Sequence, residues 1–159
     1  MKQKLTNLAV GELVAAVVFW INFFLFKKLI TTTKSLISIS FSLFILSFIL
    51  IQGSIFWCIL IKRISKPGFA AKYTGKIYNK LKILDVILLC MGVLVIILNY
   101  STFFTMVLSF AIWIFAVIEW VNYYKLQLSY SLNPVVLLKY IMQRKLRKSK
   151  IANEIDKSI

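Results

Sequence analysis

The chain has 159 residues, of which 60% are hydrophobic, and its 20 Lys and Arg against 5 Asp and Glu give a formal net charge of +15. Soluble domains are about 45–50% apolar, so this composition and a mean hydropathy of +0.85 exclude an ordinary water-soluble domain. The chain has no histidine, which excludes sites that need imidazole, such as histidine-ligated haem and multi-histidine di-iron centres.

Four long apolar runs follow one another along the chain. They cover residues 8–26, 36–61, 83–100 and 103–124. Each is near the length needed to cross about 30 Å of hydrocarbon at 1.5 Å per helical residue. Their Leu, Ile, Val and Phe do not alternate with polar residues, and helices satisfy their own backbone groups in lipid. The sequence therefore predicts an all-α integral membrane protein with a four-transmembrane-helix bundle over residues 1–124.

The first run resembles a secretory signal peptide in having Lys2 and Lys4 before an apolar stretch. It is longer than a typical signal core, contains Glu12, and ends without a small-residue cleavage site. We therefore expect it to be retained as the first span.

Loop charges predict the orientation of the spans. The segment 62–82 carries seven Lys and Arg and no acid, whereas Ser101 and Thr102 join the last two runs without a charge. By the positive-inside rule this places both termini and the basic loop in the cytoplasm. The many Lys, Ile, Asn and Ser residues and the small size suit an AT-rich bacterial genome, so we expect the plasma membrane of a bacterium. Lys27, Lys28 and Lys34 lie in the loop that this topology puts outside, and they leave the topology of the first hairpin open.

The basic loop turns at Pro67-Gly68, and Tyr73, Ile77 and Leu81 then recur at every fourth position among lysines. This pattern predicts an amphipathic helix that lies on the inner leaflet and runs into the third span.

The tail, residues 125–159, is basic. Asn133-Pro134 is a typical helix start, so we expect a C-terminal interfacial helix with an apolar segment to Met142 and a basic one to Lys150. Bases near a membrane surface attract anionic headgroups. The residues expected to contact anionic lipid are Lys62, Arg63, Lys66, Lys72, Lys76, Lys80, Arg144, Lys145, Arg147 and Lys148.

Small and polar residues form a face on each span, and such faces pack against other helices in membranes. The predicted faces are Gly11-Ala15-Val18-Asn22, Ser40-Ser47-Ser54 beside Ser38-Ser42-Ile45-Ile49-Gln52, Asp85-Leu89-Gly92-Ile96-Asn99, and Thr105-Ser109-Ile112-Ala116-Glu119-Tyr123. The tryptophans and the tyrosines near the run ends are interpreted as membrane-interface anchors.

Three acids, Glu12, Asp85 and Glu119, fall inside apolar runs and at the same inner depth under the predicted topology. Intramembrane carboxylates usually face the protein interior. One interpretation pairs each with Lys82, Lys125 or a loop lysine and so fastens the inner rim. Another makes them a cation or proton site. The candidate intramembrane binding residues are Glu12, Asp85, Glu119, Gln52, Asn22 and Asn122.

The chain lacks the motifs that would indicate a reaction, such as a glycine-rich phosphate loop, histidine–metal spacing or a G-x-S-x-G elbow. We therefore predict a non-enzymatic polytopic membrane protein that acts by binding, as an accessory, regulatory or immunity-type protein. Its expected partners are the anionic bilayer and a membrane protein or a second copy of the chain. Nucleic acid, cofactors and metals are not expected. The alternatives are a small transporter or ion or proton pathway using the carboxylates, and a lipid-modifying membrane enzyme.

Overall fold

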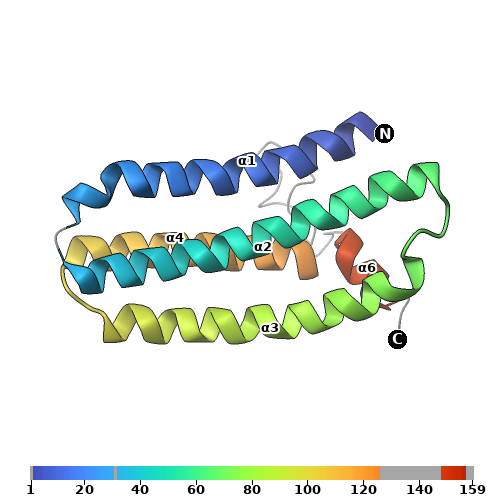
Figure 1. Ribbon diagram of the computed structural model, residues 1–159. Helices are drawn as coiled ribbons and strands as arrows, with labels where there is room; N and C mark the ends of the chain where they lie inside the picture. The colour runs from blue at the N-terminus through green and yellow to red at the C-terminus, as the bar shows by residue number, and fades with distance from the viewer. Residues whose placement is uncertain (1, 31, 126–147, 157–159) are drawn as a thin grey trace, which may run out of the picture.

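A computed structural model of the chain describes residues 2–30, 32–125 and 148–156. Within these residues the fold is all-helical, as predicted (Figure 1). The α-helices are α1 (Lys2–Phe26), α2 (Thr33–Ser65), α3 (Ala71–Leu98), α4 (Phe103–Tyr124) and α6 (Lys150–Asp156), and a 3-10 turn, η1 (Lys27–Leu29), follows α1.

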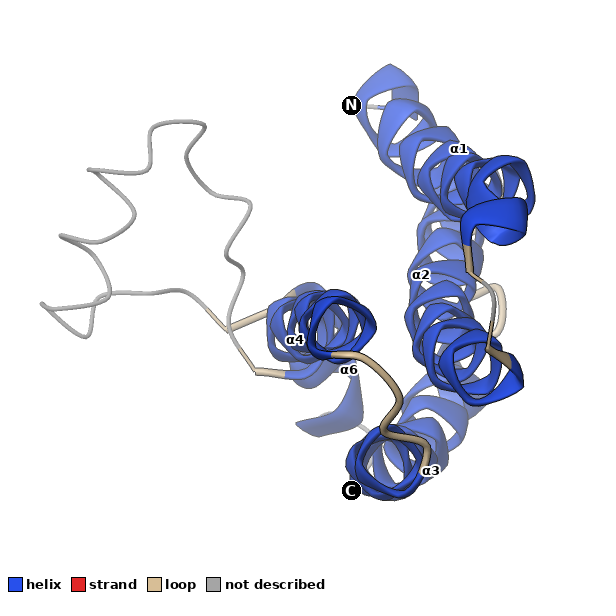
Figure 2. Cartoon of the chain, turned by 90° about the vertical axis from the view of Figure 1, so that its left-hand side faces the viewer, coloured by secondary structure: helices blue, strands red, loops and turns tan. Residues whose placement is uncertain are grey.

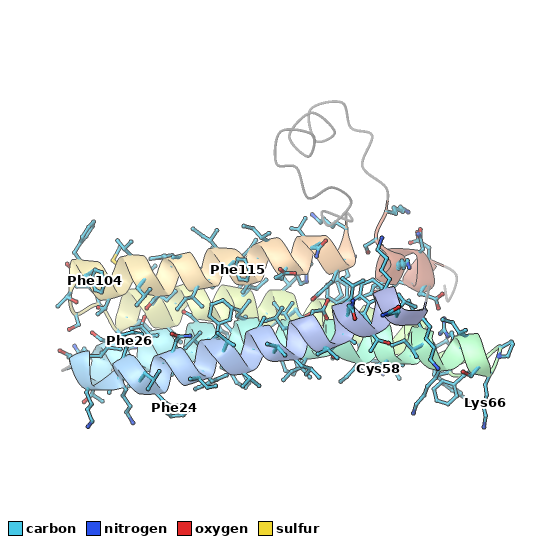
Figure 3. The ribbon with its side chains drawn as sticks, turned by 90° about the horizontal axis from the view of Figure 1, so that it is seen from above. Phe24, Phe26, Cys58, Lys66, Phe104 and Phe115 are labelled. Atoms are coloured by element: carbon cyan, nitrogen blue, oxygen red, sulfur yellow. The ribbon has the colours of Figure 1, made fainter. Side chains whose placement is uncertain are left out.

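Four of these helices are long and apolar enough to cross a membrane: Lys2–Phe26, Thr33–Ser65, Tyr73–Leu98 and Phe103–Tyr124. Their outer surfaces carry large apolar side chains. Phe24 is 62% exposed and Phe104 is 75% exposed, and both point away from the neighbouring helices (Figure 3). Lipid tails, unlike water, solvate such surfaces without penalty. The prediction of a multi-pass membrane protein is confirmed.

The helices extend past the apolar runs. The 33 residues of α2 span about 50 Å, against about 30 Å of hydrocarbon. At its end, Gly68 has a φ of +86°, which glycine adopts at no steric cost, and α3 begins at Ala71. The segment predicted as an amphipathic helix is thus the first part of α3, continuous with the third span.

Helix α2 is central in the arrangement. It lies between α1 and α3, and α4 packs against both α2 and α3 (Figure 2). The middle of the core is a layer of α2 side chains, Ile45, Leu46, Ile49 and Leu50, each at most 3% exposed. Because α2 contacts all three other spans, its polar residues decide which groups are brought together.

Interhelical hydrogen bonds follow the small-residue faces. Ser38 Oγ donates to Ser109 Oγ of α4 at 3.1 Å. On the opposite side of α2, Trp20 Nε1 donates to Ser47 Oγ at 2.9 Å, and Ser54 Oγ donates to the Ala9 carbonyl of α1 at 2.9 Å. The two serine stripes of α2 therefore face different partners.

The predicted packing face of α1 is wrong. Gly11, Val18 and Asn22 are exposed, whereas Ala9 and Ala16 are buried. At 100° per residue, Ala9 and Ala16 lie about 140° round the helix from the centre of the predicted face, and of that face only Ala15 packs partly against the core. The seven-residue spacing of the two alanines lets α1 approach α2 closely enough for the hydrogen bond at the Ala9 carbonyl.

The N-terminus, the turn after α2 and helix α6 lie at one end of the molecule (Figure 1); we call it the α6 end. Helix α6 packs against α3 and α4 by burying Ile151 and Ile155, which are 2% and 5% exposed. The interfacial helix expected after Asn133-Pro134 falls largely in residues 126–147, outside the described residues.

Candidate functional site

A polar cavity of about 130 Å³ opens at the α6 end, where α1, α2, α4 and α6 meet. Its lining is made of Leu8, Glu12, Trp57, Glu119, Asn122, Tyr123, Ser149, Lys150 and Ile151. Two of the three acids predicted from the sequence thus face one space, together with residues from the short C-terminal helix.

Glu12 reaches the cavity from α1. Trp57 Nε1 of α2 donates a hydrogen bond of 2.7 Å to Glu12 Oε1, and this bond fixes the carboxylate. The other oxygen, Oε2, is buried, and the neighbouring Tyr123 hydroxyl is the donor that the described residues place beside it. A carboxylate oxygen has a second lone pair, so this oxygen is also a place where a donor from outside the chain would be stabilised.

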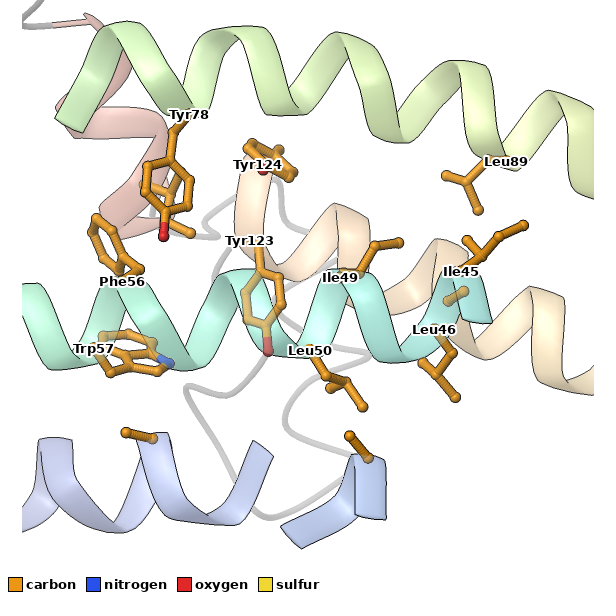
Figure 4. Close-up of a cluster of buried hydrophobic side chains, with 14 of the residues drawn as sticks. Ile45, Leu46, Ile49, Leu50, Phe56, Trp57, Tyr78, Leu89, Tyr123 and Tyr124 are labelled. Atoms are coloured by element: carbon orange, nitrogen blue, oxygen red, sulfur yellow. The ribbon is translucent and has the colours of Figure 1, made fainter. Parts of the chain in front are cut away.

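Tyr123 of α4 extends toward α1 beside Trp57 (Figure 4). The residue is only 4% exposed, and its hydroxyl is placed to donate to the Glu12 carboxylate. The phenol and the Glu12 carboxylate meet over Gly53 of α2: the hydroxyl oxygen and Glu12 Oε2 each lie 2.5 Å from the position that a Cβ on Gly53 would take. Only glycine leaves room for both groups at this point of α2.

Glu119 lies in the next turn of α4 toward the middle of the membrane. Asn122 Nδ2, three residues on, donates to Glu119 Oε2 at 3.3 Å. Both side chains line the cavity. The Glu119-x-x-Asn122-Tyr123 sequence therefore places a carboxylate, an amide and a phenol on one side of a single helix.

The first residues of α6 close the cavity. Ser149 Oγ donates to the backbone carbonyl of Tyr123, and it also accepts the Ala152 amide at 3.0 Å, so it caps α6 while joining it to α4. Lys150 lines the cavity, and its Nζ lies 5.4 Å from the centre of the Trp57 ring. The indole is thus bonded to a carboxylate through its nitrogen and contacts an ammonium through its face.

Asp85 lies elsewhere, in a buried network on the α3 side of α2. Gln52 Nε2 donates to Asp85 Oδ1 at 2.7 Å, and the Tyr124 hydroxyl donates to Gln52 Oε1 at 2.6 Å. The Tyr78 hydroxyl donates to the Gln52 carbonyl at 2.7 Å. Asp85 is fully buried, and its Oδ2 has no partner among the described residues. The adjacent Tyr123 and Tyr124 thus serve two separate clusters.

The expected pairing of the three acids with rim lysines does not occur in the part of the chain that the structure describes. The ion pairs there are Arg63–Glu154 at 2.8 Å and Lys148–Asp156 at 2.6 Å. Lys125 instead lies 5.5 Å from the centre of the Trp120 ring. The carboxylates are held by amides and an indole, because these groups come from the helices that enclose them.

The basic residues divide into exposed and internal groups. Lys62, Lys66, Lys76, Lys80 and Lys148 are exposed, whereas the side chain of Lys72 and the residues Arg144, Lys145 and Arg147 lie outside the described part. Arg63 is internal. It donates to the Phe69 carbonyl and Thr74 Oγ1, both at 2.9 Å, and pairs with Glu154. It therefore joins α2, the turn, α3 and α6.

Asn22 is remote from both clusters: it is exposed and its Nδ2 donates to the Val18 carbonyl of its own helix at 2.8 Å.

No family model, curated protein or solved structure matches this chain.

Sequence reasoning missed the aromatic members of the site. Trp57, Tyr123 and Tyr124 were expected to anchor the helices at the membrane interface, yet all three are buried and hydrogen-bond or face the acidic groups. The predicted face of the fourth span already contains Tyr123, four residues after Glu119, and this shared face is the signal that links the phenol to the carboxylate.

Proposed function

We propose that the protein is a non-enzymatic, multi-pass plasma-membrane protein that acts by binding, in an accessory, regulatory or immunity role, and that the cavity at the α6 end is its binding site. The observation that carries the proposal is the meeting of two carboxylates, Glu12 and Glu119, with a buried phenol hydroxyl around one cavity. Functional sites are the usual places for intramembrane acids and for polar groups whose hydrogen-bonding capacity the protein itself does not fill.

The four spans, in this proposal, form a bundle in a bacterial membrane with the α6 end in the cytoplasm. The position of the N-terminus, the basic turn and α6 at one end supports this orientation, since seven basic residues of segment 62–82 lie there. The exposed lysines of that end contact anionic headgroups. A membrane-protein partner or a second copy of the chain would approach the lipid-facing surface.

Cysteine labelling tests the orientation. In a Cys58→Ser, Cys90→Ser background, Lys28→Cys should react with a membrane-impermeant maleimide in intact cells, and Lys66→Cys should react only after lysis. The reverse pattern would contradict the orientation.

A small transporter or ion pathway is the second candidate, because Glu12 and Glu119 converge on the same cavity. The surroundings favour binding over passage. Toward the middle of the membrane the interior is the apolar layer of Ile45, Leu46, Ile49 and Leu50, and the polar groups beyond that layer bond to one another, as in the Ser38–Ser109 pair.

Mild extraction from native membranes tests the proposal. We expect a stoichiometric occupant that mass spectrometry detects with the parent protein and with Asn22→Ala, whose side chain lies far from the cavity, but not with Glu12→Gln/Glu119→Gln. A protein that carries no occupant, yet moves a cation or proton across proteoliposomes in a Glu12-dependent manner, would replace binding with transport.

A further inference from the structure

The cavity presents hydrogen-bond capacity that the described chain does not use. Glu12 Oε2 and the Tyr123 hydroxyl are both buried and meet over the same glycine, where the phenol is placed to donate to the carboxylate. Tyr123 is more than nine-tenths buried and lines the cavity. Buried polar groups in proteins are nearly always paired with protein, water or ligand. With the phenol donating to it, the carboxylate oxygen keeps a second lone pair, and the phenol oxygen can still accept a bond. Both are open to one donor from outside the chain.

The charge of the cavity lining indicates whether the ligand is a cation or an anion. Glu12 and Glu119 contribute two carboxylates, and Lys150 contributes one ammonium, so ionised acids leave the lining net negative. An anion would be repelled in this partly enclosed space, where electrostatic interactions are stronger than in water. A cation that donates hydrogen bonds satisfies both the charge and the open lone pairs.

The Trp57 ring narrows the ligand class further. Its face already contacts the Lys150 ammonium at 5.4 Å, a distance at which an aromatic ring attracts a cation. A cavity of about 130 Å³ is close to the size of an engineered cavity of about 150 Å³ that binds benzene. The space therefore fits a small organic cation or the cationic end of a larger molecule.

We propose that the cavity binds a primary ammonium group, held by Glu12, Glu119 and Tyr123, and that Lys150 of α6 is the chain's own competitor at its mouth. This rests on the proposed function and names its ligand class. The ammonium is carried either by a soluble amine or by an ethanolamine lipid headgroup, since both present the same donor. Because α6 is tied to α4 through Ser149, Lys150 stays within reach of the site.

Calorimetry of the full chain in nanodiscs tests the proposal, with ethylammonium chloride as the probe in bilayers that lack primary amines. We expect one site per chain. Tetramethylammonium, sodium and magnesium should bind at least about tenfold more weakly, which is the loss expected for one hydrogen bond to a charged group. Equal binding of ethylammonium and tetramethylammonium, or no ethylammonium binding, would overturn the proposal.

Variants separate ligand binding from folding. Tyr123→Phe removes only the hydroxyl that lies beside Glu12 and keeps the buried ring, so we expect it to fold and to bind about tenfold more weakly. Lys150→Gln should bind ethylammonium about tenfold more tightly, because it removes a tethered cation, whereas a merely structural lysine would not have this effect. Asn22→Ala should bind like the parent. Parent-like affinity in both Tyr123→Phe and Lys150→Gln would refute the assignment.

Adding phosphatidylethanolamine to the nanodisc distinguishes the two sources of the ammonium group, a lipid headgroup and a soluble amine. Phosphatidylethanolamine in the nanodisc should suppress ethylammonium binding if the headgroup is the occupant, and should leave it unchanged if the occupant is a soluble amine. If ethylammonium fails to bind while Glu12→Gln/Glu119→Gln still loses a native occupant, the ligand class is wrong and the proposed function stands. If ethylammonium does not bind and no native occupant is found, both the ligand class and the proposed function are wrong.

Discussion

Replacement of Gln52 by an apolar residue of similar size should strongly destabilise the fold. Its side chain, 5% exposed, donates to Asp85 of α3 and accepts from Tyr124 of α4. Gln52→Leu keeps a similar volume but removes both bonds. Two average interhelical hydrogen bonds in a membrane protein are worth about 1 kcal/mol together. The larger loss comes from Asp85, because Oδ1 would lose its Gln52 donor and only the Tyr124 hydroxyl would remain beside the buried carboxylate.

Leaving a buried polar group without its partner costs about 1–3 kcal/mol, with the upper part of the range for charged groups, and we expect Gln52→Leu to cost about 2–3 kcal/mol. The matched control is Ser38→Ala, which removes one ordinary interhelical bond of 3.1 Å and should cost about 0.6 kcal/mol. Unfolding in SDS and detergent mixed micelles, followed by circular dichroism, measures both losses.

A double-mutant cycle identifies the source of the cost. Gln52→Leu/Asp85→Leu should recover at least about 1–2 kcal/mol of the single-variant loss, since replacing both partners by apolar groups can be nearly neutral. If Gln52→Leu is no more destabilising than Ser38→Ala, or if the two replacements are additive, the role assigned to this network is refuted.

Two further changes test the closeness of packing at the α6 end. Gly53→Ala should destabilise the fold by about 1–3 kcal/mol, because a Cβ there would overlap the carboxylate and the phenol that meet at this point. Gly11→Ala is the control: no atom lies within 4 Å of its Cβ position, and it should stabilise the fold by about 0.5–1 kcal/mol. A neutral Gly53→Ala in the same unfolding assay would contradict the geometry. Arg63→Gln should release α6 and speed cleavage by a protease that cuts after Glu154, because that ion pair is mostly shielded from solvent. Lys148→Gln breaks an exposed pair of small value and should be cleaved at the parent rate, so equal rates for the two variants would argue against the Arg63 anchor.

The apolar runs predicted the spans because the length of hydrocarbon to be crossed fixes the number of apolar residues. They did not predict where helices end. Helix α2 continues to Ser65 and α3 begins at Ala71, since backbone hydrogen bonding goes on in water after the apolar requirement has ended. Lysines there mark the edge of the membrane and do not stop a helix.

The acids of the site were predicted as residues, but their grouping was not. Glu12 and Glu119 share the cavity, while Asp85, expected at the same depth, bonds to Gln52 on the other side of α2. Depth follows from position along a span, whereas grouping depends on how each helix is rotated about its axis. Small-residue faces indicate rotation only where a helix has one such face, and α1 has two, of which Ala9 and Ala16 mark the one that packs.

The most direct measurement of the central claim is a high-resolution structure of the protein extracted from native membranes into nanodiscs. The account predicts non-protein density in the cavity, within hydrogen-bonding distance of both Glu12 Oε2 and the Tyr123 hydroxyl. A cavity without such density would contradict it.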